Sequence, residues 1–334
     1  MLRLSVKLLI LVCAFFFFGL AIRRAFFELS QSEVPLDWNS IGWFQLAMSV
    51  FSGMLALIPP CIAWQLVLRD FGQVVHWWNC YYAYFLGHLG KYVPGKAMAV
   101  FLRVGQLRRH QVALGPAVLS VFIETLAGFA TGGILGAILL QWIDCPNWLR
   151  LSALAGIPLA IVSLLPHPFR WILGPMVRTR IGKSLTTLIV AIDGWMMLRT
   201  VLLAVAGWTF QGIALWFVLH SLVGVSSGLM VQTSSWQVLI VCIASMSLGG
   251  LAGFLSMLPG GAIARELASI GVLVSVVPQP TAVIATVLVR LTSILAELLM
   301  VAWTKWIDYR YSAENDRGID ATQQFVSSQQ RTDK

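Results

Sequence analysis

The chain has 334 residues, of which 58% are hydrophobic and only 11% are charged. A soluble domain carries about 25% charged residues, and several apolar runs here reach the roughly 20 residues that cross a bilayer. This composition excludes a soluble domain and predicts an all-α polytopic membrane protein. The net charge of +9 does not indicate nucleic-acid binding, because the positive residues cluster in a few loops, as they do on the cytoplasmic side of membrane proteins.

Seven full membrane spans are predicted from the apolar runs. The first, Leu4 to Ile22, is followed by Arg23 and Arg24 instead of a cleavage site, so we interpret it as a retained span. The second contains Pro59 and Pro60, whose freed carbonyls should face protein or water. The remaining boundaries follow from the apolar runs: about Trp43 to Leu68, Pro116 to Leu140, Trp148 to Leu165, about Thr200 to Val223, about Trp236 to Leu258, and about Thr281 to Trp303.

The segments between and after the spans set the expected topology. Ser184 to Arg199 is moderately amphipathic and suits a helix that lies in the membrane interface. Seven spans with the N-terminus inside would place the C-terminus outside, whereas Lys305 and Arg310 favour the inside. An eighth crossing after Pro259 removes the conflict. Both counts stay open, and we favour an integral membrane domain over residues 1–305 with a polar, disordered cytoplasmic tail over 306–334.

A first Pro-Gly stretch interrupts the apolar sequence within a segment, about residues 80–110, that should dip into the membrane without crossing it. Its letters are Gly-Lys-Tyr-Val-Pro-Gly-Lys from Gly90 to Lys96. Proline fits the first turn of a helix and glycine permits a sharp bend, so a helix should begin near Pro94 and reach about Arg109, with Gly95 as a hinge. Its expected polar face carries four residues: Lys96, Arg103, Gln106 and His110. Free amides at a helix start, together with Lys91 and Lys96, favour an anion site, for which a lipid phosphate is the natural ligand.

A second Pro-Gly stretch follows the sixth span and opens a broken-helix or re-entrant segment over about residues 259–280. Pro259, Gly260 and Gly261 should end the preceding helix, and a new helix should carry Arg265 and Glu266 in its first turns. Adjacent helical residues point about 100° apart, so these two need not pair with each other. Arg265 could face a phosphate-binding cavity, while Glu266 favours the positive helix start.

Isolated acidic residues in two spans are candidates for charge coupling. Glu124 shares a four-residue spacing with Ser120, Gly128, Gly132 and Gly136, so it should face the bundle along a groove of small residues. In the last span, Arg290 and Glu297 lie seven residues apart on one face and should pair with each other or across the bundle. An intramembrane carboxylate is costly and indicates a functional site, although a structural ion pair is the competing interpretation.

No catalytic motif is found, and the five cysteines show no metal-ligand spacing, so we expect no metal and no cofactor. The two Pro-Gly stretches resemble the flippase-like transmembrane domain of lysylphosphatidylglycerol synthases over about residues 1–305. The resemblance rests on two groups of residues: Lys91, Pro94, Gly95, Lys96 and Arg103, and then Pro259, Gly260, Gly261, Arg265 and Glu266. Ile263 stands where that family commonly has glycine. The soluble aminoacyl-transfer domain is missing, so the resemblance does not support lysyl transfer.

The resemblance implies an inner-membrane bundle of about seven to eight helices that moves a phospholipid or a lipid-linked glycan between leaflets, or assists this. In that interpretation Lys91, Lys96, Arg103 and Arg265 hold the phosphate, while Glu124, Glu266 and Glu297 balance charge or couple protons. The expected partners are membrane lipids, with a protein partner or a second copy also possible and nucleic acid excluded. Two alternatives stay open: a membrane glycosyltransferase that uses a polyprenyl-phosphate donor, and a scaffold for a lipid-modifying enzyme.

Overall fold

The computed structural model describes residues 41–92, 97–168, 170, 185–222, 234–256, 258, 261 and 263–332, without the side chains of residues 185–187, 308 and 311–332. The predicted first span, Leu4 to Ile22, lies outside these residues. The described part is α-helical and contains no strand. Its elements are α2 (Trp43–Asp70), α3 (Trp77–Leu89), η2 (Gly90–Tyr92), α4 (Ala97–Leu107), η3 (Arg108–His110), α5 (Leu114–Leu139), η4 (Leu140–Trp142), α6 (Asn147–Leu164), α8 (Leu185–Val190), α9 (Gly194–Ser221), α10 (Ser235–Leu255), α11 (Ala264–Leu273) and α12 (Gln279–Thr332).

Within the described residues, six helices are long and apolar enough to cross a membrane. They are α2, α5 with η4, α6, α9, α10 and the first part of α12, and each overlaps a predicted span. The chain is therefore an all-α integral membrane protein. The predicted interfacial helix over 184–199 is wrong in one respect, because the helix ends at Val190 and α9 begins at Gly194. Asp193 separates the two, since its side chain accepts a hydrogen bond from the Met196 amide at 2.7 Å and caps α9.

Contacts along α2 define the direction of its neighbours. The Gly42 amide donates to the Ser221 carbonyl at 3.0 Å, and Arg199 pairs with Asp70 at the other end, so α2 and α9 are antiparallel. By contrast, Ser49 and Thr292 share a hydrogen bond of 3.0 Å, and Gly53 lies against Ala296, so α12 runs parallel to α2. The expectation that the Pro59–Pro60 region faces protein is confirmed, because Pro60 and the Ala56 carbonyl pack against Gly207 of α9.

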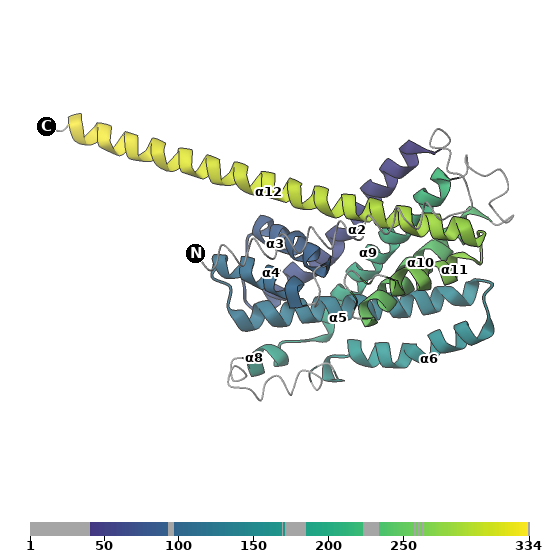
Figure 1. The fold of residues 1–334 in the computed structure, drawn as a ribbon. Coiled ribbons are helices and arrows are strands. Elements are labelled where there is room, and N and C mark those ends of the chain that lie inside the picture. The colour runs from purple at the N-terminus through teal and green to yellow at the C-terminus, as the bar shows by residue number, and fades with distance from the viewer. Residues whose placement is uncertain are drawn as a thin grey trace.

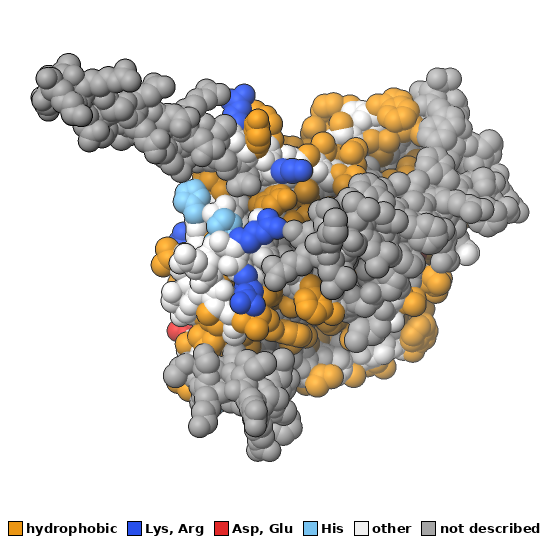
Figure 2. Space-filling view, turned by 60° about the vertical axis from the view of Figure 1, so that its left-hand side comes forward, with side chains coloured by type: hydrophobic (Ala, Val, Ile, Leu, Met, Phe, Trp, Pro, Cys, Tyr) orange, Lys and Arg blue, Asp and Glu red, His pale blue; other side chains and the backbone are white. Residues whose placement is uncertain are grey.

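We call the end of the bundle near Asp70 the basic end, because exposed cations gather there: Arg69, Arg108, Arg109, Lys305 and Arg310. Figure 2 shows blue Lys and Arg side chains next to orange hydrophobic side chains on the described part of one face. Trp78 of α3 contacts Trp303 of α12 with ring centroids 6.3 Å apart, which brings the end of the predicted last span to the start of α3. Lys305 therefore lies at the same end as Arg109, as their charges lead one to expect.

Two helical hairpins enter the bundle from opposite ends (Figure 1). The first hairpin is α3, η2 and α4. Its entry and exit lie side by side at the basic end, where Asn79 and His110 share a hydrogen bond of 3.3 Å. The second hairpin is α10 and α11, whose chains run antiparallel because Ser245 and Ser269 exchange side-chain to backbone hydrogen bonds of 3.0 and 3.2 Å.

The second hairpin turns the chain back between α9 and α12, a change of direction that seven full spans alone would not give. It begins after α9 ends and returns the chain to the same end, where α12 starts. With only 10 residues, α11 has about half the length that crosses a bilayer. This return lets α12 run parallel to α2 and brings Lys305 to the basic end. The backbone of α12 stays helical to Thr332, past residue 306 where the sequence places the start of the tail (Figure 1). The disorder of that tail in solution stays a prediction.

Candidate functional site

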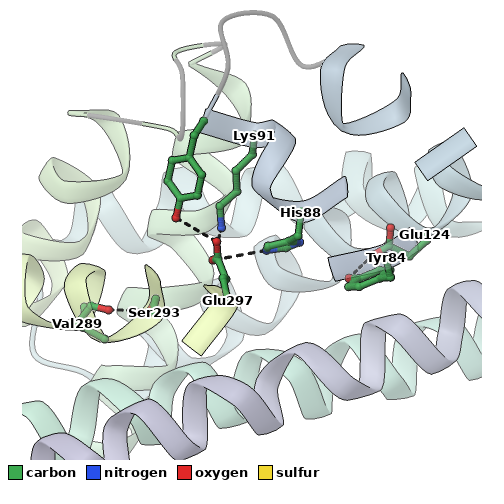
Figure 3. Close-up of polar contacts among 8 residues, drawn as sticks. Tyr84, His88, Lys91, Glu124, Val289, Ser293 and Glu297 are labelled. Atoms are coloured by element: carbon green, nitrogen blue, oxygen red, sulfur yellow. Dashed lines mark hydrogen bonds and ion pairs between the residues drawn. The ribbon is translucent and has the colours of Figure 1, made fainter. Parts of the chain in front are cut away.

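The carboxylate of Glu297 on α12 is held by the tip of the first hairpin. Lys91 Nζ donates to Glu297 Oε1 at 2.5 Å, and the Tyr92 hydroxyl donates to Oε2 at 3.1 Å. His88 Nε2 lies 3.7 Å from Oε1. Figure 3 shows Lys91 and His88 pointing toward Glu297, which is only 4% exposed. Thus three side chains from about one turn of the chain, three and four residues apart, lie around a single buried anion.

A second ion pair ties α12 to the other hairpin. Arg290 donates to Glu266 Oε1 on α11, and both side chains are mostly buried. The other oxygen, Glu266 Oε2, is buried and has no hydrogen-bond partner among the described residues. The prediction that Arg265 and Glu266 need not pair is confirmed. Of the two options for Arg290 and Glu297, pairing across the bundle is confirmed and pairing with each other is wrong.

Arg265 is a partly buried cation that no carboxylate of the described residues pairs with. It is half-buried on the first turn of α11, and no described Asp or Glu lies within 4.0 Å of its guanidinium. Its charge acts on Lys91, His88 and Tyr92, so it lies within electrostatic reach of the Glu297 cluster. The tips of both hairpins therefore bring positive charge to one place.

Arg103 occupies a separate, closed cage beneath the first hairpin. Its guanidinium donates to Glu124 Oε2 at 2.6 Å, and the Tyr84 hydroxyl donates to Glu124 Oε1 at 3.0 Å. The guanidinium carbon lies 4.1 Å from the centroid of the Tyr84 ring and 5.3 Å from that of Trp64. Arg103 is 5% exposed and Glu124 is 8% exposed. Cation–π contacts and an ion pair together replace the water that a buried guanidinium loses.

Two glycines of the first hairpin make this cage possible. A Cβ added at Gly87 would lie 2.2 Å from Arg103 Cγ, so the arginine stem lies directly over this residue. A Cβ at Gly90 would lie 2.7 Å from the Ala99 backbone nitrogen. The absence of side chains at these positions lets α3 and α4 pack closely, and the ring of His88 then stacks on that of Tyr84 with centroids 5.9 Å apart. The cage and the Glu297 cluster are thus continuous through α3.

The start of α11 has an unusual backbone. Ile263 has φ 71° and ψ −60°, a left-handed conformation that a β-branched residue rarely adopts. Gly261 also has positive φ, at 68°, and a Cβ there would lie 2.8 Å from Gly253 Cα. The backbone at Ile263 thus favours glycine, which is the residue that the resembling family commonly has at this position. Gly261 serves as a turn residue, as the sequence predicts.

The structure divides the predicted site residues into three sets. Lys91, Glu297 and Arg265 gather at the hairpin tips, with Arg290 and Glu266 beside them. Arg103 and Glu124 form the separate cage, and Glu124 faces the bundle as its spacing with Ser120 predicts. The remaining predicted residues lie outside the described part of the chain: Lys96, Pro94, Gly95, Pro259 and Gly260.

The structure differs from the sequence prediction in the polar face of α4 and in the side chains that complete the site. Arg103 is buried whereas His110 is exposed, because α4 ends at Leu107 and the 3₁₀ turn that follows takes His110 off the face. Four side chains that complete the site were not predicted as site residues: Trp64, Tyr84, His88 and Tyr92. The available signals were the presence of Tyr92 inside the first Pro-Gly stretch and the aromatic character of the segment around Tyr84.

Comparison with known proteins gives one assignment. No curated protein matches the chain. Residues 4–300 match the family described as the lysylphosphatidylglycerol synthase TM region. The match covers both hairpins and, up to Met300 in α12, each of the six described helices that are long and apolar enough to cross a membrane. The chain therefore belongs to the family of the lysylphosphatidylglycerol synthase TM region, a membrane domain related to lipids.

Proposed function

We propose that this protein moves an anionic phospholipid or a lipid-linked glycan between the two leaflets of the membrane, with the lipid phosphate bound between the hairpin tips. The observation that carries this proposal is the position of Arg265. A half-buried guanidinium without a described carboxylate partner, within electrostatic reach of Lys91, attracts an anion from outside the protein. Membership of a lipid-related membrane family supports a lipid phosphate as that anion.

The arrangement of the hairpins supports movement of the lipid instead of simple binding. The first hairpin reaches the site from the basic end and the second reaches it from the opposite end. Transporters use broken helices of this kind, whose starts point at an anionic substrate near the middle of the bilayer. A phosphate between two such tips can become accessible from one side when one hairpin withdraws, and from the other side when the second withdraws.

The residues have different roles in this proposal. Lys91 and Arg265 contact the phosphate, and Lys96 is assigned to it from the sequence alone. Arg103 and Glu124 hold the first hairpin in position instead of touching the lipid, because they already pair with each other and both are buried. Glu266 and Glu297 balance charge at the site, while Pro94, Gly95, Pro259, Gly260 and Gly261 act as hinges.

Orientation follows from the distribution of charge. The positive-inside bias places the basic end in the cytoplasm, together with Lys305 and Arg310 at the end of the predicted last span. The opposite end, at Gly42 and Ser221, then faces outward. We propose a bacterial inner membrane as the location.

Reconstitution in liposomes tests the proposed function. Vesicles with a fluorescent phosphatidylglycerol analogue in both leaflets are treated with a membrane-impermeant reductant, and fluorescence beyond the outer-leaflet fraction is lost only if lipid crosses. Wild type should exceed empty vesicles, Arg265→Ala should abolish most of the excess, and Arg265→Lys should retain part of it. Arg199→Ala is the matched control, because that arginine pairs with Asp70 far from the hairpin tips.

The assay is repeated with a fluorescent phosphatidylethanolamine and a polyprenyl-phosphate sugar. If wild type moves none of the three lipids faster than empty vesicles do, the proposal is overturned. Equal activity of wild type and Arg265→Ala would leave lipid movement standing and remove Arg265 from its mechanism.

A further inference from the structure

The donors around Glu297 form the coordination that a phosphate group receives in proteins. An ammonium and a phenol donate to its two oxygens at 2.5 and 3.1 Å, with an imidazole nitrogen 3.7 Å from one of them. All three side chains come from the first hairpin, whereas the anion comes from α12. The hairpin therefore presents a preformed anion site, and a side chain of the protein occupies it (Figure 3).

We infer that the Glu297 carboxylate is an internal stand-in for the substrate, and that a lipid phosphodiester displaces it from Lys91 and Tyr92. This inference rests on the proposed function and adds that, at the same site, Glu297 competes with the lipid phosphate for Lys91 and Tyr92. The ligand class is a singly charged phosphodiester, which presents two anionic oxygens as a carboxylate does.

Arg265 gives the phosphodiester its advantage over Glu297. The described contacts of Glu297 are with the first hairpin, and none joins it to Arg265 on the second. A phosphate at the same place can accept a hydrogen bond from Lys91 and feel the charge of Arg265 on the second hairpin, so it is attracted to both hairpins, whereas Glu297 contacts only the first.

An internal competitor also explains how the lipid leaves. Transport requires binding that is favourable enough to admit a substrate and weak enough to release it. Without a competitor, an anionic lipid would bind tightly to Lys91, Tyr92 and Arg265 and would dissociate slowly. The return of Glu297 to Lys91 supplies the competing interaction, so removal of its charge should raise affinity and reduce turnover.

Binding measurements on the full chain in detergent test this inference. Dihexanoyl phosphatidylglycerol is titrated by calorimetry into wild type, Glu297→Gln and Glu124→Gln. Glu297→Gln should bind on the order of tenfold more tightly, the effect of losing a charged hydrogen-bonding competitor. Glu124→Gln is the matched control, because it neutralises another buried carboxylate whose partner is Arg103, and it should show no tightening. In the liposome assay, Glu297→Gln should move lipid more slowly than wild type.

Two further arms separate the sources of the ligand. Inorganic phosphate and dihexanoylglycerol, which lacks the phosphate, should both bind much more weakly than the phospholipid to Glu297→Gln. Tightening seen with inorganic phosphate alone would place a free phosphate at the site and overturn the lipid assignment. If Glu297→Gln does not fold, Glu297→Asp replaces it, because the shorter side chain withdraws the charge from Lys91 and should also tighten binding.

Unchanged or weaker binding in a folded Glu297 variant would overturn the inference, since a purely structural ion pair predicts that result. This failure differs from failure of the proposed function. A wild type that moves lipid while its Glu297 variants bind no more tightly rejects the stand-in alone. Tightening by Glu297→Gln in a protein that moves no lipid rejects transport and leaves the anion site.

Discussion

Arg290 and Glu297 lie two helical turns apart on α12, and each holds a different hairpin through a charge of opposite sign. Arg290 pairs with Glu266 of α11, and Glu297 pairs with Lys91 of η2. One face of α12 thus contacts both hairpins. Each hairpin fits only one of the two positions, because the first presents a cation to Glu297 and the second presents a carboxylate to Arg290.

The pair on the second hairpin should tolerate exchange of its charges. Glu266→Arg alone places two cations together in a mostly buried site and should lose both stability and lipid movement. Glu266→Arg combined with Arg290→Glu restores an opposite-charge pair and should recover at least part of the stability, because the attraction depends on opposite sign. Thermal unfolding in detergent and the liposome assay check this. A double variant no more stable than either single one would show that the pair does not couple α11 to α12.

The Arg103–Glu124 cage should be costly to break from one side. Arg103→Leu leaves a buried carboxylate without its partner, and loss of one member of a buried pair costs about 3–5 kcal/mol. The double variant Arg103→Leu with Glu124→Leu should be less destabilised than Arg103→Leu alone, since no unpaired charge remains. Unfolding free energies in a double-mutant cycle measure the coupling. Asp70→Asn supplies the comparison with a more exposed pair, where the expected loss is below about 1 kcal/mol.

Ile263→Gly should stabilise the protein. The left-handed backbone of Ile263 costs on the order of 1–3 kcal/mol for a non-glycine residue, which exceeds the roughly 0.5–1 kcal/mol that glycine adds to the entropy of the unfolded chain. Its side chain is 43% exposed, so little packing is lost. Thermal unfolding should therefore shift upward. Gly261→Ala is the opposite case, because its φ is also positive and its Cβ would meet Gly253, and it should shift unfolding downward.

Labelling from one side of the membrane should separate the two ends of the bundle. In a cysteine-free background, a cysteine at Arg109 lies at the basic end, and one at Asp144 lies in the exposed turn between α5 and α6 at the opposite end. A membrane-impermeant maleimide added to intact cells should label the cysteine at position 144, whereas the cysteine at position 109 should react only after the cells are opened. The reverse pattern would place the basic end outside.

The sequence predicts the parts of this structure that depend on local spacing. Apolar length locates the spans, and the shared four-residue spacing of Glu124 and the glycines places that carboxylate toward the bundle. Gly132 accordingly lies against the Trp208 ring and Gly136 against Leu248. The separation of Arg265 from Glu266 also follows from helical geometry alone.

The partners in the site could not be predicted in this way. Lys91 and Glu297 are 206 residues apart, and nothing in the spacing of either segment encodes their contact. Arg103 has the charge of a phosphate ligand, yet the packing of α3 and α4 across Gly87 and Gly90 directs it onto Glu124. The choice between ligand and structural partner was decided by tertiary packing, which a single sequence does not specify.

The continuity of α12 has a mechanical consequence. A helix is stiff along its axis because its hydrogen bonds run parallel to that axis. This one helix carries both ion pairs, and its backbone continues to Thr332 beyond the bundle (Figure 1). A force applied to the distal part of α12 therefore reaches Glu297 and Arg290 together, so a single helix can act on both hairpins at once.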